Sequence, residues 1–282
     1  MHYRSAIPVL VGCLFATNVL AADLMQTYME ALANDPQYAS ARASLMAGQE
    51  KSTQGLAKLL PNLSASGGYG RNWFEGLNYN ENKYTIALTQ PIFNWANYQN
   101  YETSKLQVSI SEAQFAQAQQ DLMMRVSQAY FDILAAEDVV TFAKAQKAAV
   151  AQQLELAKRS FQVGTTTITD THEAQARYNL AEADEISALN DLEVKRTALE
   201  QIIGHPPGEL DPLKKGVKLS APEPNVMTSW VSSAENQNYQ VVQYRLSREV
   251  AKRNIKATQA GHMPTVDLVA SYNHTNRDQY MI

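Results

Sequence analysis

The chain has 282 residues, one cysteine and a formal net charge of −4. This length can bury the core of one or two domains, and the mild negative charge favours neither nucleic acid nor an anionic membrane surface as a partner. The single cysteine, Cys13, excludes an intrachain disulfide bond.

Residues 1–21 have the pattern of a secretory signal peptide. Arg4 is their only charged residue, residues 7–15 form an apolar core, and Val19-Leu20-Ala21 ends the segment with a small side chain. This pattern predicts export and cleavage after Ala21. The segment is too short for a lasting membrane anchor.

Cys13 allows a second interpretation of the same segment. Leu10-Val11-Gly12-Cys13 resembles the lipobox of bacterial lipoproteins, in which the cysteine is acylated. We favour an ordinary signal peptide, because the apolar run continues past Cys13 to a good cleavage site.

Two helices are expected after the signal segment. A short one covers about residues 24–33, and a second starts with Asp35 as N-cap and Pro36 at its first position, running to about Lys58. The second helix has a seam of small residues between leucines, which permits close contact with another helix. This seam consists of Leu45, Gly48, Ser52, Gly55 and Leu59.

Apolar residues then alternate with a period of two, which predicts a β-hairpin over residues 63–93. We expect strands of about ten residues on either side of a polar loop at residues 74–83, a length that suits tilted strands crossing a bilayer. One strand face is apolar and the other small and polar. Aromatic residues are expected at the strand ends, as in membrane-interface belts: Trp73, Phe74, Tyr84, Phe93 and Trp95. An ordinary half-buried hairpin in a soluble sheet is the alternative, and the hairpin alone slightly favours it.

Residues 96–162 are predicted to form one helix of about 100 Å, since they contain neither proline nor glycine. The expected seam advances in alternating steps of four and three residues, the repeat of a coiled coil. It consists of Leu122, Val126, Ala129, Ile133, Ala136, Val140, Ala143, Lys147, Val150, Leu154, Ala157 and Phe161. Only Lys147 in it is not apolar. Before Leu122 the seam is weaker, with Val108 and Phe115 as its apolar members.

A second helix is predicted over residues 170–203, with Asp170 and Glu173 as its capping box and Gly204 after its end. The two helices would form an antiparallel coiled-coil hairpin. Because the second helix is much shorter, we expect the helix before Pro61 to cover the remaining length of the first.

The pattern of the opening residues returns near the end of the chain. Residues 204–225 are rich in proline, glycine and lysine and are expected to be an irregular linker. A short helix, a break, a helix over 239–260 and a strand over 265–273 follow, so residues 22–203 and 226–282 are expected to be a first repeat and the start of a second. The matches place Tyr38, Leu45 and Lys51 201 positions before Tyr239, Leu246 and Lys252, and Pro61 and Tyr69 203 positions before Pro264 and Tyr272.

These elements and several motifs resemble the TolC-type outer-membrane efflux family over the whole mature chain. The most specific motifs are Leu88-Thr89-Gln90-Pro91-Ile92-Phe93, Ala129-Tyr130-Phe131-Asp132-Ile133-Leu134, Arg159-Ser160-Phe161-Gln162-Val163-Gly164, Ile168-Thr169-Asp170 and Gly261-His262-Met263-Pro264-Thr265-Val266-Asp267-Leu268. The resemblance implies a mainly α fold with β: a coiled-coil hairpin belonging to an α-barrel and a transmembrane β-hairpin belonging to a β-barrel. It also implies homotrimers in the outer membrane, a periplasmic adaptor and an inner-membrane transporter as partners, and contact with outer-membrane lipid.

In that family, residues 204–225 would correspond to an equatorial belt around the tunnel. The periplasmic tip, where inner-membrane partners dock, would comprise Val163, Gly164, Thr165, Thr166, Thr167, Ile168, Thr169 and Asp170. The resemblance further implies that Thr169 and Asp170 help to hold the resting duct closed. The sequence ends in the first strand of the second repeat, so we expect the 282 residues alone not to form a conducting channel.

No catalytic or cofactor-binding pattern is recognisable, and none of the five histidines has metal-ligand spacing. We therefore expect a passive exit duct of an efflux pump or a type I secretion system, not an enzyme. The alternative is a soluble periplasmic coiled-coil adaptor, but an adaptor would lack alternating strands at the start of two repeats.

Overall fold

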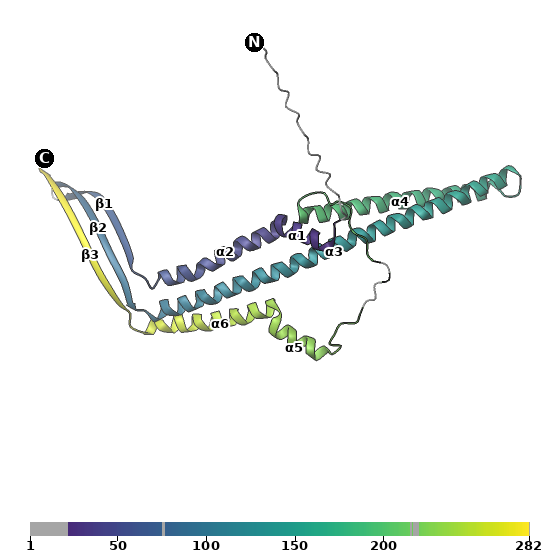
Figure 1. Cartoon of the computed structure of the whole chain (residues 1–282). Helices are drawn as coiled ribbons and strands as arrows, with labels where there is room; N and C mark the ends of the chain where they lie inside the picture. Colours follow the sequence, from purple (N-terminus) through teal and green to yellow (C-terminus); the bar gives the residue numbers. More distant parts are fainter. Residues whose placement is uncertain (1–21, 75–76, 215, 217–219, 282) are drawn as a thin grey trace, which may run out of the picture. The chain divides into compact units, whose positions relative to one another are not determined.

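A computed structural model of the chain describes residues 22–281, except 75–76, 215 and 217–219 (Figure 1). The predicted signal segment, and Cys13 within it, lie outside the described residues. Helices α1 to α6 and strands β1 to β3 follow one another along the chain in the order that the sequence predicts: α1, α2, β1, β2, α3 to α6 and β3. A short 3-10 helix follows α6. The expected class, mainly α with β, is confirmed.

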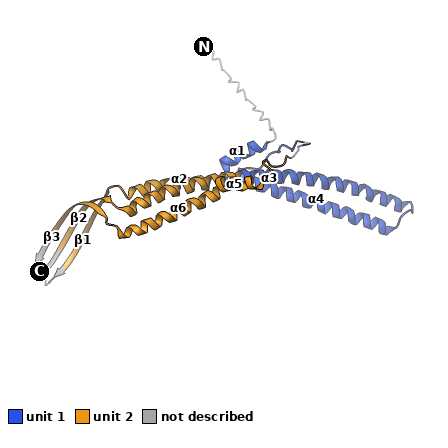
Figure 2. Cartoon of the chain, turned by 90° about the horizontal axis from the view of Figure 1, so that it is seen from below, with its two compact units in different colours: residues 1–35, 123–217 blue, residues 36–122, 218–282 orange. Residues whose placement is uncertain are grey.

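The chain forms two compact units, and the longest helix, α3 (Trp95–Gln162), belongs to both. Unit 1 contains residues 1–35 and 123–217, and unit 2 contains residues 36–122 and 218–282 (Figure 2). Each unit therefore joins segments that are far apart in the sequence.

In unit 1, the second half of α3 pairs with α4 (Ile168–Ile203). The predicted seam of α3 is buried at its large residues, and Val140 and Ala143 pack in one cluster with Ala188 and Leu192 of α4. Only the last seam residue, Phe161, is exposed, at the end of the hairpin. The four-three pattern thus identified the surface that α3 presents to its neighbour.

Lys147, the one charged member of the seam, is bound across the hairpin. Its ammonium group lies 3.1 Å from Glu182 and 3.0 Å from Glu185 of α4. Hydrogen bonds to Glu185 and then Glu182 raise the pKa of Lys147. The lysine therefore stays charged within the seam.

Helix α1 (Leu24–Asn34) packs against the end of α4 in the same unit, burying Thr27 and Ala31. Asp35, which follows α1, is also buried, and Arg125 binds its two carboxylate oxygens at 2.9 and 3.0 Å. A bidentate arginine compensates a buried carboxylate well, so this pair fixes the end of α1 against α3.

In unit 2, α2 (Pro36–Ala57) lies on the first half of α3. Gly48 faces Ser111 and Gly55 faces Ser104, both so closely that a Cβ atom at either glycine would collide with the serine side chain. Tyr38 packs on Phe115 with ring centroids 5.5 Å apart. The small-residue seam of α2 thus makes the close contact expected of it.

Helix α6 (Tyr239–Gln259) follows α5 (Met227–Gln237) and contacts the same half of α3 through polar side chains. Gln243 donates a hydrogen bond of 2.9 Å to Gln117, and Arg253 donates one of 3.2 Å to the buried Gln99.

The sheet has the order β1-β2-β3, with both pairs antiparallel. Strand β1 covers Asn62–Phe74, β2 covers Leu77–Phe93, and β3 covers Val266–Met281. The expected loop at 74–83 is wrong, because residues 77–83 continue β2 and pair with both neighbours. Backbone hydrogen bonds sustain this part of the strand without an apolar alternation in the sequence.

The order of α1, α2 and β1 recurs in α5, α6 and β3, and the starts of the two helices share one offset. Helix α5 begins at Met227, 203 residues after Leu24 of α1, and α6 begins at Tyr239, 203 residues after Pro36 of α2. The Pro61–Pro264 match has this offset too, whereas the matches of Tyr38, Leu45 and Lys51 have an offset of 201 residues. Tyr38 and Tyr239 therefore hold different positions in their helices.

Candidate functional site: the hairpin tip and the two-faced sheet

The turn between α3 and α4 is closed by backbone hydrogen bonds of a Schellman motif. Gly164 has a φ of +75°, in the left-handed region that glycine adopts without strain. The Gly164 N–H donates a hydrogen bond to the carbonyl of Phe161 at 3.0 Å, and the Thr165 N–H donates one to the carbonyl of Ser160 at 2.9 Å. The last carbonyls of α3 are thus satisfied within the turn, which gives the tip a defined shape.

The predicted capping box at Asp170 and Glu173 is wrong, because α4 begins at Ile168 with Thr167 as its N-cap. The Asp170 N–H donates to the Thr167 hydroxyl at 3.2 Å, and the Asp170 carboxylate accepts from the Thr167 N–H at 2.9 Å. Thr167 and Asp170 have the same three-residue spacing, so the box forms one turn earlier.

The Asp170 carboxylate is the most strongly bound charge at the tip. Hydroxyl groups of Thr166 and Thr167 donate to it at 2.5 and 2.7 Å. These bonds, with the backbone N–H of Thr167, lower the pKa of Asp170 to about 2. The side chain is nevertheless exposed, so the tip presents a fixed negative charge to solvent at neutral pH.

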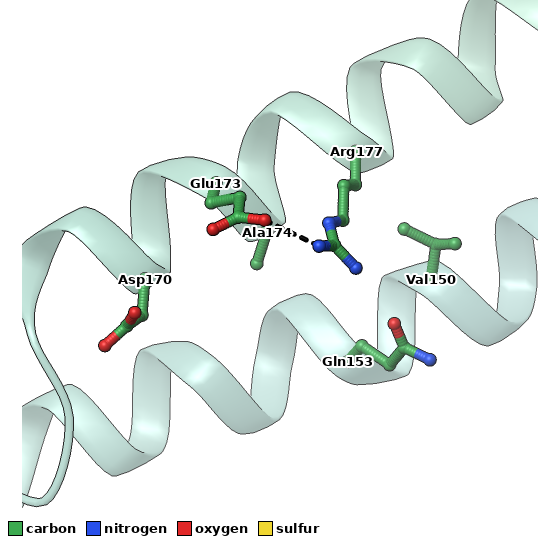
Figure 3. A pocket seen from close by; sticks show the side chains of 6 residues that line it. All are labelled: Val150, Gln153, Asp170, Glu173, Ala174 and Arg177. Atoms are coloured by element: carbon green, nitrogen blue, oxygen red, sulfur yellow. Dashed lines mark hydrogen bonds and ion pairs between the residues drawn. The ribbon is translucent and has the colours of Figure 1, made fainter.

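A shallow groove of about 210 Å³ lies beside the tip, between the two helices (Figure 3). Asp170, Glu173, Ala174 and Arg177 of α4 line one side, and Val150 and Gln153 of α3 line the other. Arg177 forms an ion pair of 2.5 Å with Glu173. The groove thus combines an apolar floor with charges of both signs.

Apolar side chains are also exposed at the turn itself. Val163 is 74% exposed and Ile168 is 49% exposed. All eight residues predicted for the tip are contiguous in the turn and the first residues of α4, and all but Thr166 are exposed. The tip thus combines a hydrogen-bonded backbone turn, a fixed charge and exposed apolar side chains.

The sheet is the second candidate site, because its two faces differ in chemistry and both are exposed. The register places Leu63, Ala65, Ile86, Leu88, Leu268, Ala270 and Tyr272 on one face. Of these, Ile86 is 51% exposed and Tyr272 is 67% exposed. Apolar side chains on this face have no covering layer among the described residues.

The opposite face of the sheet is polar and hydrogen-bonded. Thr85 donates to Asn273 at 2.7 Å, and Arg277 lies 3.4 Å from Glu81 across the same strand pair. The Ser64 hydroxyl donates to the carbonyl of Ala87 at 3.4 Å. Several polar side chains of this face thus find partners within the sheet, and the face can be solvated.

The predicted aromatic belt is only partly described. Phe93 and Trp95 lie at the junction of β2 and α3, and Trp95 stacks on Tyr98 with centroids 5.2 Å apart. Tyr84 is instead in the middle of β2, opposite Gly67 and His274, because the expected loop is strand. Trp73 and Phe74 belong to β1, but their side chains lie outside the description.

The described residues contain no cluster of three or more histidine, cysteine or acidic side chains that could hold a metal ion. Their helices also include none that is long and apolar enough to cross a membrane.

A family model described as "Outer membrane efflux protein" matches residues 27–205. Outer membrane protein TolC of Vibrio cholerae is 31% identical over 278 residues, covering 97% of this chain and 64% of TolC. Alkaline protease secretion protein AprF of Pseudomonas aeruginosa is 32% identical over 272 residues, covering 92% of this chain and 56% of AprF.

A solved structure gives the same picture of the fold. The outer membrane protein VceC of Vibrio cholerae superimposes with a TM-score of 0.72 at 16% identity, covering 92% of this chain and 68% of VceC. This likeness shows a shared fold. The chain spans between 56% and 64% of the length of the two curated relatives that it matches here.

Proposed function

The chain belongs to the outer membrane efflux protein family, and from that premise we propose that it forms part of an exit duct across the periplasm and the outer membrane. The duct would serve an efflux pump or a type I secretion system; the family description names efflux, and the name of the AprF relative includes secretion. Its work would be passive: it provides a hydrated path and performs no chemistry.

The two-faced sheet is the observation that carries this proposal. An apolar face with Ile86 and Leu88 exposed suits contact with lipid, and the hydrogen-bonded polar face with Thr85 and Asn273 suits contact with water. A soluble sheet would need a covering layer for the apolar face. We therefore favour the duct over a soluble periplasmic adaptor.

The tip is proposed as the surface where a periplasmic adaptor or an inner-membrane transporter docks. Its support is the ordered turn around Gly164 and the exposed side chains of Val163 and Ile168. We also propose that Thr169 and Asp170 contribute to keeping the duct closed. Asp170→Asn in the assembled duct tests this, because conductance should rise if the charge holds the duct closed and stay unchanged if it only caps α4.

Assembly as a homotrimer in the outer membrane is part of the same proposal. In the described chain the sheet has three strands, so the outer edges of β1 and β3 carry unpaired backbone groups. A bilayer does not tolerate such edges. Pairing between copies or with further strands would satisfy them.

Adjacent residues of β2 provide a matched test. Ile86→Lys places a charge on the apolar face, and Thr85→Lys places the same charge on the polar face. A lysine facing lipid near the bilayer midplane costs about 2–4 kcal/mol, whereas one facing water costs little. Membrane fractionation should find Ile86→Lys depleted from the outer membrane and Thr85→Lys retained. Equal distribution of both variants would contradict the assigned faces.

A further inference from the structure

We propose that the amino terminus created by signal cleavage is a bound ligand of the folded chain: the α-ammonium group of Ala22 docks on residues 209–211. The proposal rests on the predicted cleavage after Ala21 and is independent of the exit-duct function. Residues 209–211, in the linker after α4, would then have a role of their own: they bind the new amino terminus.

Ala22 forms a parallel β-bridge with Leu210. The N–H of Ala22 donates to the carbonyl of Glu209 at 2.8 Å, and the N–H of Asp211 donates to the carbonyl of Ala22 at 3.1 Å. Leu210 is 9% exposed, so the bridge is held by an apolar anchor as well as by its two hydrogen bonds. Cleavage would turn the Ala22 nitrogen into an ammonium group, and this nitrogen already donates a hydrogen bond to the Glu209 carbonyl.

Tyr130 of α3 connects both sides of this bridge. It is 3% exposed, and its hydroxyl lies 2.8 Å from the carbonyl of Asp211 and 3.2 Å from that of Ala22. Burial and then the charge of Asp211 raise the pKa of Tyr130, so the hydroxyl remains a donor. The buried Tyr130 hydroxyl thus donates to both carbonyls that the bridge brings together, those of Ala22 and Asp211.

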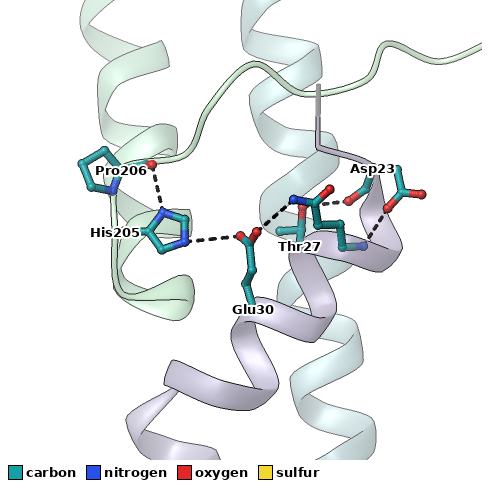
Figure 4. A network of polar contacts seen from close by, with 6 residues as sticks. Asp23, Thr27, Glu30, His205 and Pro206 are labelled. Atoms are coloured by element: carbon teal, nitrogen blue, oxygen red, sulfur yellow. Dashed lines mark hydrogen bonds and ion pairs between the residues drawn. The ribbon is translucent and has the colours of Figure 1, made fainter. Parts of the chain in front are cut away.

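The residues after Ala22 are fixed as well, which gives the terminus a defined position. The Asp23 side chain accepts a hydrogen bond of 2.6 Å from the Gln26 N–H and caps α1. Farther along α1, Glu30 lies 3.3 Å from His205, and the His205 ring also contacts the Pro206 carbonyl at 3.1 Å (Figure 4). Helix α1 is therefore tied to the start of the linker at two places.

The charges next to Ala22 along the chain and across the bridge are negative: Asp23, Glu209 and Asp211. The charges of Asp211 and Asp23 both contribute to the raised pKa of Tyr130. Hydrolysis of the Ala21–Ala22 peptide bond consumes one water and leaves a carboxylate on Ala21 and an ammonium group on Ala22. Cleavage would therefore place a positive charge in a stretch of the fold whose neighbouring charged residues are acidic, while keeping a donor for the Glu209 carbonyl.

The test compares the chain that starts at Ala22 with a chain that retains Ala21. The extra residue keeps the amide hydrogen bond to Glu209 and the net charge of the chain, but it moves the ammonium group away. Mass spectrometry first establishes where the mature chain begins, and a start other than Ala22 overturns the proposal. Hydrogen exchange of the Asp211 amide then reports directly on the bridge.

We expect the Asp211 amide to exchange roughly two- to fivefold faster when Ala21 is retained, the range of a partly exposed charge pair. The difference should shrink in high salt, because screening weakens it. Tyr130→Phe should speed exchange in both chains, since it removes the hydroxyl whatever the terminus. Equal exchange in the two chains, while Tyr130→Phe still speeds it, would show that the bridge exists without using the ammonium group and would overturn the proposal.

Discussion

The two halves of α3 pack in opposite ways. In unit 1 the seam buries large apolar residues such as Ile133 and Leu154 against neighbouring helices. In unit 2 the same helix buries small and polar ones, with Ser104 and Ser111 directly beneath the glycines of α2. One continuous helix thus packs through large apolar side chains along one half and through close approach of two helix backbones along the other.

Ser104 and Ser111 can be buried in the first half of α3 because their hydroxyl groups are hydrogen-bonded locally. Ser104 donates to the carbonyl of Tyr101 at 2.7 Å, and Ser111 donates to that of Gln107 at 3.0 Å. These bonds to the preceding turn satisfy the hydroxyls without needing space from α2. The comparison implies that the first half should be sensitive to added volume and the second to removed volume.

The largest effect is expected from removing volume in unit 1. Ile133 is 1% exposed, and Ile133→Ala should leave a cavity and destabilise the chain by about 2–5 kcal/mol. Denaturant unfolding gives the difference in free energy. Val139→Ala on the same helix is the control, because Val139 is 54% exposed; similar losses for both variants would refute the assigned seam.

Adding one methyl group in unit 2 is the converse experiment. Gly55→Ala would drive a Cβ into the side chain of Ser104, and such overpacking typically costs about 1–3 kcal/mol. Gly68→Ala is the control, since nothing lies within 4 Å of its Cβ position.

A double-mutant cycle sharpens this second test. Ser104→Gly should remove the collision, so Gly55→Ala should cost less in that background than in the native one. Additive losses would mean that the two positions do not touch.

These halves also show what the sequence could predict. The four-three repeat identified the large seam, and the glycines identified the close contact with α2, because both are local periodic patterns. The pair of Asp35 and Arg125 was not predicted, since its members are 90 residues apart and neither belongs to an apolar pattern.

The errors concern places where the pattern was ambiguous or absent. Residues 80–83 are Asn, Glu, Asn and Lys, so polar side chains occur on both faces there and no apolar alternation continues through them. At the tip, Thr167 and Asp170 compete as cap residues, because each is followed three positions later by an acidic residue. The turn between α3 and α4 was located correctly from the glycine and the polar residues between two helices.

A smaller effect is expected at the tip, where neither kind of packing operates. Gly164 has a φ of +75° and open space at its Cβ position. Gly164→Ala should therefore cost only about 1–2 kcal/mol, the penalty of a left-handed backbone for a residue with a side chain. Thermal unfolding measures it, and a loss as large as that of Ile133→Ala would show that the tip is more tightly packed than we describe.

The smallest effect concerns pH at the same turn. The pKa of Asp170 is lowered to about 2 in the folded chain, whereas an unperturbed aspartate has a pKa of about 3.9. Its contribution to stability should therefore be complete above about pH 4 and be lost as the pH falls toward 2.

Hydrogen exchange at the first residues of α4 measures this pH effect. Asp170→Asn should abolish the pH dependence in that window while leaving α4 folded. Persistence of the same dependence in the variant would assign it to another group.

The proposal that the sheet spans the outer membrane can be tested by measuring which face of β2 contacts water. The only cysteine, Cys13, lies in the predicted signal segment, so the mature chain offers a cysteine-free background. Thr85→Cys and Ile86→Cys place a thiol on opposite faces of β2, and a membrane-impermeant maleimide reports which of them contacts water. In isolated outer membranes, we expect labelling at position 85 and protection at position 86. Rapid labelling of both positions would contradict a membrane-spanning sheet.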